Sequence, residues 1–402
     1  MCTAIGWQGK HFMFGRNLDL EYGFRERVTQ VARGSLLRFA AMPPARTAYA
    51  MLGMAAEEGG FPLFAEAVNE CGLCAAGLYF PHSARMRAAG DMRKGERAAE
   101  GKAAAAGDMQ GAAGAAAERA ATAGDIQGAA GAAAERAATA GDIQGAEGAA
   151  AERAATAGDR QNAEGAAEKT AAAGRAIAPH EMVAALLARC ADTRQARAFL
   201  QGAEVVSIPY KNYPVPALHW LVADRFGCFV AEPAEGGLRL YDDPAGVLAN
   251  EPPFPFQLHN LHAYRHLTAA EPACGFGMPL KALYHGTGGV GLPGDAASPS
   301  RFVRAAFYRA NSRPFAEAGE GEGRGEGEDE ADVAEQDAAQ MFHMLSAVEM
   351  VKGGVLTEEG RPCYTRYACC IDADAGVYYL KRYGSLGAEK FTLHRQGAEE
   401  IK

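Results

Sequence analysis

The sequence predicts an α+β protein in which antiparallel sheets are covered by helices on their outer faces. Two observations lead to this fold class. Short apolar and aromatic segments come in pairs that are separated by Gly, Pro and Asp, as the strands of hairpins are. Other segments carry apolar residues three or four positions apart, which is the spacing of a helix face. These helical segments stand apart from the paired strands, which is typical of antiparallel rather than parallel sheets.

The expected elements can be placed by these two patterns. The strands are expected at Thr3–Gln8, His11–Gly15, Tyr49–Met54, Ala75–Phe80, Leu218–Val222, Cys228–Glu232, Leu238–Asp242 and Val377–Arg382. The helices are expected at His180–Cys190, Thr193–Gly202, Ser300–Asn311 and Ala338–Val351.

A repeated segment interrupts this pattern between about residues 88 and 173. The unit GDMQGAAGAAAERAATA begins at position 107, and related units begin at 124, 141 and 158. Each unit offers at most one large apolar residue (Met109, Ile126 or Ile143), which is too little to stack repeats into a solenoid. Its glycines also oppose the helix that its alanines favour. We expect a solvated insertion that is partly helical or disordered.

A second low-complexity segment, residues 316–337, is rich in glutamate and glycine and is expected to be a flexible surface loop. The rest of the chain, 1–402, is interpreted as a single domain that these two segments interrupt. The net charge of −9 argues against a nucleic-acid partner. No run of about 18 apolar residues predicts a membrane span, and the first residues do not resemble an export signal, so a cytoplasmic location is expected.

The nine cysteines do not suggest a disulfide framework, because their number is odd and no export signal is present. Cys71 and Cys74 form a CxxC pair, but a structural zinc site needs a second pair of ligands, and the adjacent Cys369 and Cys370 are expected to point to opposite faces of a strand. We therefore expect the cysteines other than Cys2 to be buried thiols.

Three histidines, His259, His262 and His266, have the spacing of one helical face and could hold a metal ion. No acidic residue with matching spacing accompanies them, so neither a metal nor a cofactor is predicted.

The start of the chain carries the clearest sign of catalysis. Removal of Met1 would leave Cys2 with a free α-amine, whose pKa in model peptides is about 7.7–8.0. Such an amine can take the proton of its own thiol, so one residue supplies both nucleophile and base. Arg16 and Asp19 follow in a segment that can return beside Cys2 in a hairpin, where they could hold the thiolate and the amine. A plain surface Arg–Asp pair is the alternative.

The opening MCTAIGWQGKHFMFGRNLDLEYGF strongly resembles the choloylglycine hydrolase family, which contains bile salt hydrolases and penicillin V acylases. Five further blocks resemble this family in the same order along the chain: NECGLCAAGLYFP (69–81), LHWLVAD (218–224), YDDPAGVLANEPPF (241–254), GGVGLPGDAASPSRF (288–302) and MFHMLSAVEMVKGG (341–354). The repeats and the acidic segment fall between these blocks.

The resemblance implies the four-layered αββα sandwich of N-terminal-nucleophile (Ntn) hydrolases, which is built on two antiparallel sheets. It also implies a set of catalytic positions, namely Cys2, Arg16, Asp19, Tyr79, Asn250 and Arg301. Cys2 would be the nucleophile, and the Asn250 side chain and the Tyr79 backbone N–H would stabilise the oxyanion. Asp19 would position the α-amine, and the two arginines would place positive charge near the thiolate. Without the resemblance, Asn250 would be taken for a turn residue and Arg301 for a surface charge.

The expected reaction is hydrolysis of the amide between a bile acid and glycine or taurine, with Leu18, Phe61 and Tyr79 in the substrate pocket. Tyr79 stands where most bile salt hydrolases have asparagine, and penicillin V acylases often have tyrosine there. Cleavage of penicillin V or another acyl amide is therefore the alternative. A different hypothesis is that the repeats make the chain an interaction protein. The family also implies a homo-oligomer, commonly a tetramer.

Overall fold

The computed structural model describes residues 1–58, 60–88, 175–278, 280–281, 284–315 and 330–394. All of them except Ala88 belong to one compact unit formed by Met1–Arg87 and Ala172–Lys402. The repeat insertion expected at 88–173 lies almost wholly outside the described residues, as does most of the acidic segment.

The first of two large sheets has six strands, and every neighbouring pair is antiparallel. In spatial order they are β15 (Val247–Leu248), β1 (Cys2–Gln8), β2 (Phe12–Leu20), β16 (Tyr364–Asp372), β17 (Val377–Arg382) and β18 (Glu389–Thr392). The second sheet has seven antiparallel strands: β14 (Gly237–Asp242), β13 (Gly227–Ala234), β12 (Leu218–Asp224), β8 (Cys74–Tyr79), β7 (Phe61–Asn69), β6 (Met51–Glu58) and β3 (Arg27–Val31).

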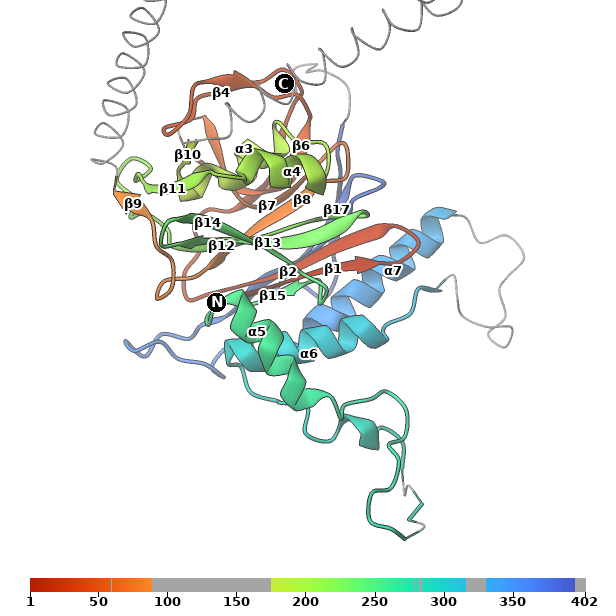
Figure 1. The fold of residues 1–402 in the computed structure, drawn as a ribbon. Coiled ribbons are helices and arrows are strands. Elements are labelled where there is room, and N and C mark those ends of the chain that lie inside the picture. The colour runs from red at the N-terminus through yellow and green to blue at the C-terminus, as the bar shows by residue number, and fades with distance from the viewer. Residues whose placement is uncertain (59, 89–174, 279, 282–283, 316–329, 395–402) are drawn as a thin grey trace, which may run out of the picture. The chain divides into compact units, whose positions relative to one another are not determined.

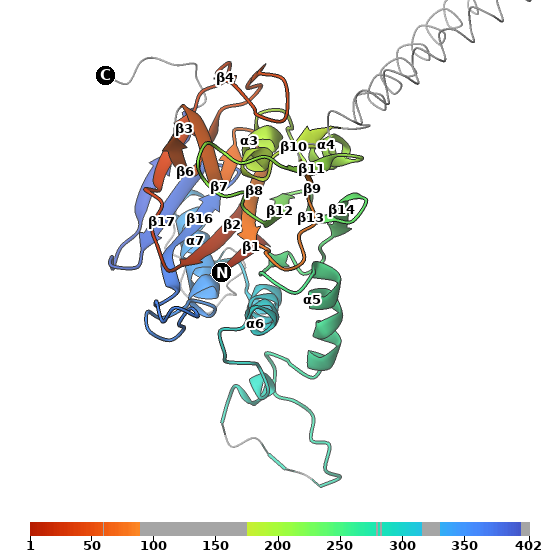
Figure 2. The same ribbon diagram turned by 90° about the vertical axis from the view of Figure 1, so that its left-hand side faces the viewer.

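Helices cover the outer faces of the two sheets, as Figures 1 and 2 show. On the first sheet, α6 (Ser298–Asn311) and α7 (Glu330–Ser346) pack against β1, β2 and β16. On the second sheet, α3 (Met182–Leu187) and α4 (Thr193–Leu200) pack against strands β7, β8, β12 and β13. One apolar cluster fills the space around the first sheet and a second lies between the second sheet and its helices. The predicted αββα sandwich is confirmed.

The close packing of α7 on the first sheet depends on a glycine. A Cβ atom on Gly15 of β2 would lie 2.5 Å from the Met341 sulfur and 3.1 Å from Leu345. Glycine therefore lets the helix approach the strand that also carries Arg16 and Asp19.

Smaller elements complete the fold. The strands β9 (Arg87–Ala88) and β10 (Ala176–Ile177), which flank the insertion, lie on either side of β11 (Glu204–Ser207) in a three-stranded sheet. A two-stranded sheet joins β4 (Leu36–Leu37) to β5 (Ala45–Arg46), and α5 (Phe254–Asn260) follows β15. The described residues also form three short 3-10 helices, η1 (Pro179–Glu181), η2 (Leu261–Tyr264) and η3 (Thr287–Gly289).

The expected loop at 316–337 is wrong for its last eight residues, because α7 begins at Glu330. Acidic residues in a first helical turn interact favourably with the helix dipole. Val333 and Ala334 are buried, and the buried Asp337 accepts the backbone N–H groups of Lys10 and Phe315. These contacts outweigh the polar composition that suggested a loop.

Candidate active site around Cys2

Cys2 is the first residue of β1, and strand alternation divides its surroundings between two faces. Cys2 lies opposite Leu18 on β2, and Ala4 lies opposite Arg16. Directly opposed residues share a face, so the side chains of Cys2, Leu18 and Arg16 project into the space between the sheets. Thr3 and Asp19 project to the other face, toward Arg301 of α6 and Thr365 of β16.

The Cys2 thiol is buried, and its described polar partner is Arg16. Arg16 Nη2 lies 3.2 Å from Cys2 Sγ. The other end of the guanidinium is fixed, because Nη1 donates to the Ala65 carbonyl at 2.6 Å and to Glu66 Oε2 at 2.7 Å. Burial lowers the pKa of Arg16, but the charges of Cys2 and Glu66 overcome this and raise that pKa well above its ordinary value. A permanent positive charge therefore lies beside the thiol.

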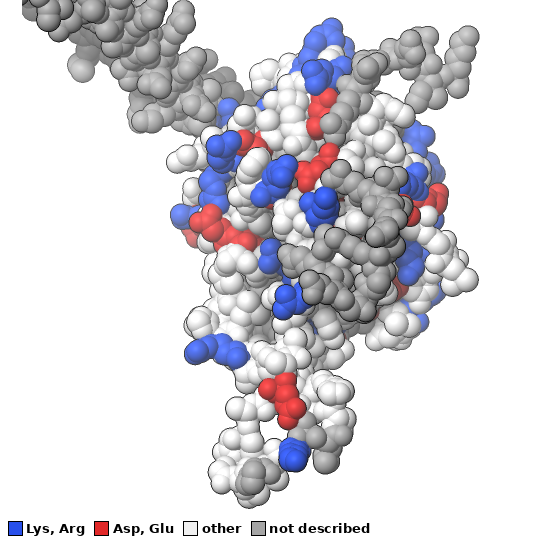
Figure 3. Space-filling model, turned by 90° about the vertical axis from the view of Figure 1, so that its right-hand side faces the viewer, with Lys and Arg blue, Asp and Glu red and all other residues white. Residues whose placement is uncertain are grey.

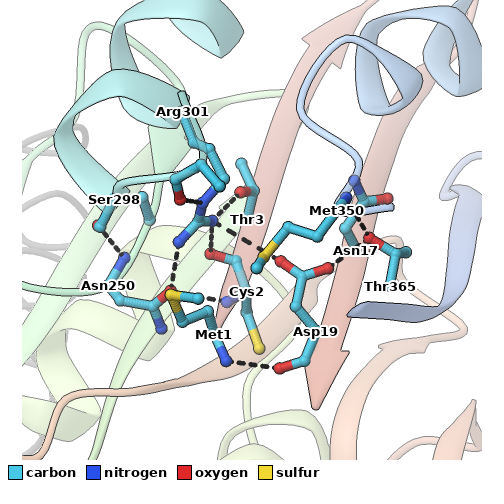
Figure 4. A network of polar contacts seen from close by, with 12 residues as sticks. Met1, Cys2, Thr3, Asn17, Asp19, Asn250, Ser298, Arg301, Met350 and Thr365 are labelled. Atoms are coloured by element: carbon cyan, nitrogen blue, oxygen red, sulfur yellow. Dashed lines mark hydrogen bonds and ion pairs between the residues drawn. The ribbon is translucent and has the colours of Figure 1, made fainter. Parts of the chain in front are cut away.

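Asn250 connects the start of β1 to two other elements (Figure 4). Its Oδ1 accepts the backbone N–H of Cys2 at 2.7 Å and Arg301 Nη2 at 2.8 Å. Its Nδ2 donates to the Tyr79 carbonyl at 2.8 Å, and its backbone N–H donates to Ser298 Oγ at 2.8 Å. An amide nitrogen carries two hydrogens, so one donor position of Asn250 is available after the bond to Tyr79.

Tyr79 is the last residue of β8, and its backbone faces the Asn250 side chain. The next residue, Phe80, donates its N–H to Ala217 at 2.8 Å, on the side of β12. Alternation along an antiparallel strand directs the N–H and C=O of Tyr79 to the opposite edge of β8. Asn250 meets the Tyr79 carbonyl at that edge. The Tyr79 side chain is 49% exposed, so it is accessible to a substrate.

Arg301, in the first turns of α6, lies behind the Cys2 peptide and is fully buried. Its Nη1 donates to the Cys2 carbonyl at 2.6 Å and also to Thr3 Oγ1, while Nε donates to the Ala296 carbonyl at 3.0 Å. Burial lowers the pKa of Arg301, and the charge of Asp19 opposes this shift. Arg301 thus fixes the Cys2 carbonyl and the Thr3 side chain.

Asp19 holds the chain terminus through its backbone rather than its carboxylate. The Asp19 N–H donates to the Met1 carbonyl at 2.9 Å, and the Met1 amine donates to the Asp19 carbonyl at 2.5 Å. The carboxylate instead accepts the Thr365 hydroxyl at 2.6 Å and lies 3.8 Å from Arg301 Nη1. Burial raises the pKa of Asp19. The expected direct contact between this carboxylate and the Cys2 amine is not present while Met1 precedes Cys2.

The expected pocket residues Leu18 and Phe61 differ in their placement. Leu18 is buried opposite Cys2, in the same apolar cluster. Phe61 belongs to the second cluster, where its ring contacts Phe39, His180 and Tyr210. Its place in the substrate pocket stays a prediction.

Several polar residues of the site were not recognised in the sequence. They are Thr3, Glu66, Ser298, Thr365 and Tyr367, and all are buried or nearly so. Only Glu66 left a signal, as the single charged residue in the apolar stretch FPLFAEAVN. Hydroxyl groups in strands and helix starts are too common to indicate a site.

The sulfur and histidine patterns do not form a metal cluster. Within the described residues no group of three His, Cys, Asp or Glu side chains could hold a metal ion. The α-helix α5 ends at Asn260, and His262 lies in η2, so the helical face expected to carry His259, His262 and His266 is interrupted. Cys71 and Cys274 are exposed, which corrects the expectation that they are buried.

No helix of the described segments is both long and apolar enough to cross a membrane.

Comparison with known proteins agrees with this fold. A family model for linear amide C–N hydrolases of the choloylglycine hydrolase family matches residues 2–95 and 164–397. A bile salt hydrolase/transferase of Lactiplantibacillus plantarum is 30% identical over 400 residues, which cover 98% of this chain and 93% of that protein. A bile salt hydrolase/transferase of Clostridium perfringens is 26% identical over 411 residues, covering 100% and 96% of the two chains.

Solved structures extend the likeness to the fold. The crystal structure of a mutant conjugated bile acid hydrolase from Clostridium perfringens matches with a TM-score of 0.66 and 24% identity, over 98% of this chain and 92% of that one. A penicillin V acylase from Agrobacterium tumefaciens matches with a TM-score of 0.57 and 16% identity, over 97% and 86%.

Proposed function

Because the chain belongs to the choloylglycine hydrolase family of linear amide C–N hydrolases, we propose that it cleaves the amide between a bile acid and glycine or taurine through a thioester on Cys2. The observation that carries this proposal is the convergence on Cys2 of Arg16, Asn250 and Arg301, which come from three separate elements.

The reaction begins at Cys2 once Met1 has been removed. The freed α-amine takes the thiol proton, and Sγ forms a bond to the carbonyl carbon of the amide. The C–N bond then breaks, and the leaving amine takes its proton from the α-ammonium. Water, deprotonated by the same amine, hydrolyses the thioester to release the acid and restore the thiol.

The oxyanion that forms during the attack needs hydrogen-bond donors. We assign this role to the remaining Nδ2 hydrogen of Asn250 and to the backbone N–H of Tyr79. The bond between Asn250 Nδ2 and the Tyr79 carbonyl supports the assignment, because it brings both donors to one place. Donors fixed in advance are effective because they need no reorganisation in the transition state.

The charged residues have distinct roles in this proposal. Arg16 is placed to stabilise the thiolate, since it lies 3.2 Å from Sγ. Arg301 holds the Cys2 carbonyl and Asn250 in position. Asp19 holds the terminus through its backbone in the chain that retains Met1, and after removal of Met1 it is available to position the α-amine.

The identity of the acyl group is proposed from the relatives. Those at 30% and 26% identity are named as bile salt hydrolases, and Leu18 beside Cys2 offers an apolar surface to a steroid. Penicillin V acylase activity is the second candidate, motivated by Tyr79, whose exposed ring could stack on an aryl group. Parallel assays with taurocholate, glycocholate and penicillin V separate the two. Cleavage of the penicillin alone would contradict the bile salt assignment.

We also propose a cytoplasmic homotetramer. The segment between α5 and α6 exposes Phe276, Met278, Leu280 and Tyr284, each by more than half of its surface. Apolar residues exposed together are typical of an interaction surface. Light scattering after size-exclusion chromatography tests the assembly, and a monomeric mass would contradict it.

A nucleic-acid partner remains unexpected. On the face in Figure 3, acidic side chains are interspersed among the basic ones and uncharged areas separate them.

The alternative is an interaction protein that binds its partners through the repeats. It predicts that the role of the protein in the cell depends on the insertion and not on Cys2.

A further inference from the structure

Glu66 reaches the space between the sheets because of a β-bulge in β7. In the pairing of β6 with β7, Met54 lies opposite Glu66 and the next residue, Ala55, lies opposite Phe64. Ala65 is therefore the extra residue on β7. A bulge of this kind changes the face to which the following side chain points. Phe64 packs in the outer cluster, whereas Glu66 points inward to Arg16, and the Ala65 carbonyl accepts a bond from the same guanidinium.

A second bulge, on the opposite sheet, directs a phenol toward Glu66. In the pairing of β16 with β2, Thr365 lies opposite Asp19 and Tyr367 lies opposite Leu18. Arg366 is the extra residue, so Thr365 and Tyr367 point to different faces of the sheet. Thr365 meets the Asp19 carboxylate, and Tyr367 meets Glu66.

The Glu66 carboxylate is surrounded by donors. Tyr378 donates its hydroxyl to Oε1 at 2.7 Å, and the Tyr367 hydroxyl lies 3.0 Å from each carboxylate oxygen. The Cys369 thiol lies 3.6 Å from Oε1. With Arg16 on Oε2, every one of these partners is at most 2% exposed. The hydrogen-bonding capacity of this buried carboxylate is thus taken up by groups that donate to it.

Arg16 thus lies between two groups that can carry negative charge. Nη1 contacts Glu66 and Nη2 contacts Cys2 Sγ. A buried guanidinium requires a counter-charge, and Glu66 supplies one whether Cys2 is a thiol or a thiolate. Glu66 therefore also limits how strongly the positive charge of Arg16 stabilises the Cys2 thiolate.

We propose that Glu66 is a positioning residue that holds Arg16 against Cys2 and, as its permanent counter-ion, sets the pH at which Cys2 ionises. Tyr367 and Tyr378 act through Glu66, because the hydrogen bonds that they donate offset part of its negative charge. This inference rests on the proposed role of Cys2 as nucleophile.

The test is the pH dependence of Cys2 alkylation by iodoacetamide in the purified full-length protein, followed by mass spectrometry of the N-terminal peptide. In Glu66→Gln, the thiolate becomes the main counter-charge of Arg16, so the pH of half-maximal alkylation is expected to fall by about one unit, a roughly tenfold change in ionisation. In Tyr378→Phe, Glu66 loses one hydrogen-bond donor, so its negative charge offsets more of the charge of Arg16. The pH of half-maximal alkylation is therefore expected to rise.

Two matched variants serve as controls. Tyr379→Phe removes the neighbouring phenol, which lies near Lys390 on the other face of β17, and Glu181→Gln removes a buried carboxylate from η1. Both are expected to leave the profile unchanged. Shifts in opposite directions for Glu66→Gln and Tyr378→Phe support the proposal, because a loss of packing alone does not reverse sign. Unchanged profiles, or shifts in one direction, would overturn it. If Glu66→Gln does not fold, an unchanged or lowered value for Tyr378→Phe alone overturns it.

Alkylation reports on the thiol whether or not bile salts are cleaved. Failure of the bile salt assignment and failure of the role of Glu66 are therefore separate results.

Discussion

Cys2 and Asn250, 248 positions apart in the chain, are joined by a hydrogen bond of 2.7 Å from the Cys2 backbone N–H to Asn250 Oδ1. After loss of Met1 the same nitrogen would be the α-amine of the proposed base. In the proposed mechanism Asn250 would then contact the base through its oxygen and present a donor to the substrate through its nitrogen. One side chain would fix the spacing between the base and the oxyanion.

Replacement of Asn250 by alanine removes both contacts. We expect kcat with glycocholate to fall by about 10²–10³, as when one oxyanion donor is lost. Steady-state kinetics with a circular dichroism check of folding measures this effect. The exposed Asn311 on α6, changed to alanine, is the matched control and should retain full activity. Activity of the Asn250 variant within tenfold of the parent would contradict the assignment.

Asp243 should make the stability of the protein depend on pH. Its carboxylate accepts the N–H groups of Gly246 and Val247 at the start of β15, and burial raises its pKa to about 7. In the unfolded chain the Asp243 carboxyl group ionises near pH 4. Between about pH 4 and 7 the native state therefore binds one more proton than the unfolded state. The stability contributed by this group is complete below pH 4 and is lost as the pH rises to 7.

The comparison of Asp243→Asn with the parent isolates this group, because asparagine does not titrate. Urea unfolding at pH 5 and pH 8 should show the parent losing stability relative to the variant, by roughly 3 kcal/mol, because about two of the three units of the shift lie above pH 5. Asp242→Asn changes the exposed neighbour and should track the parent. Parallel curves for parent and Asp243→Asn would exclude the raised pKa.

Gly53 is expected to be essential for the bulge that carries Glu66. A Cβ atom at Gly53 would lie 2.2 Å from the Glu66 carbonyl and 2.4 Å from Ala67 Cβ, and backbone cannot move aside cheaply. Gly53→Ala should lower the free energy of unfolding by about 1–3 kcal/mol, which is the usual effect of overpacking. Chemical unfolding measures this, with Gly384→Ala, which meets nothing within 4 Å, as the control. Equal stability of both variants would show that the strands can separate.

The insertion should be removable without loss of activity. Its flanking strands β9 and β10 both pair with β11, so they are separated by about 10 Å, two strand spacings. Replacing residues 89–174 with a short Gly/Ser linker is expected to leave kcat and KM for taurocholate unchanged. A folded deletion variant with altered Michaelis parameters would favour a gating role for the repeats. Loss of the cellular role, with Cys2→Ala harmless, would favour the interaction hypothesis.

The hairpin was predictable from the sequence, but the faces of its residues were not. The expected strand ended at Gly15, whereas β2 continues to Leu20, so alternation separates Arg16 from Asp19. The family resemblance identified both residues without showing that one faces the thiol and the other faces Arg301. Strand length depends on pairing with β16, which lies at the far end of the chain.

The two bulges explain why Glu66 and Tyr367 were missed. Each shifts the alternation by one residue, and the shift exists only once a partner strand sets the register. Asn250, Arg301 and Tyr79 were located because ordered motifs carry them, although their mutual contacts come from the fold.

The role of Cys2 is tested most directly by the intact mass of the catalytically active protein, followed by the mass of its N-terminal peptide after rapid acid quenching with glycocholate. We expect a chain that lacks Met1 and carries the bile acyl group as a thioester on Cys2. Full activity in protein that retains Met1, or an acyl group on any other residue, would exclude the proposed mechanism.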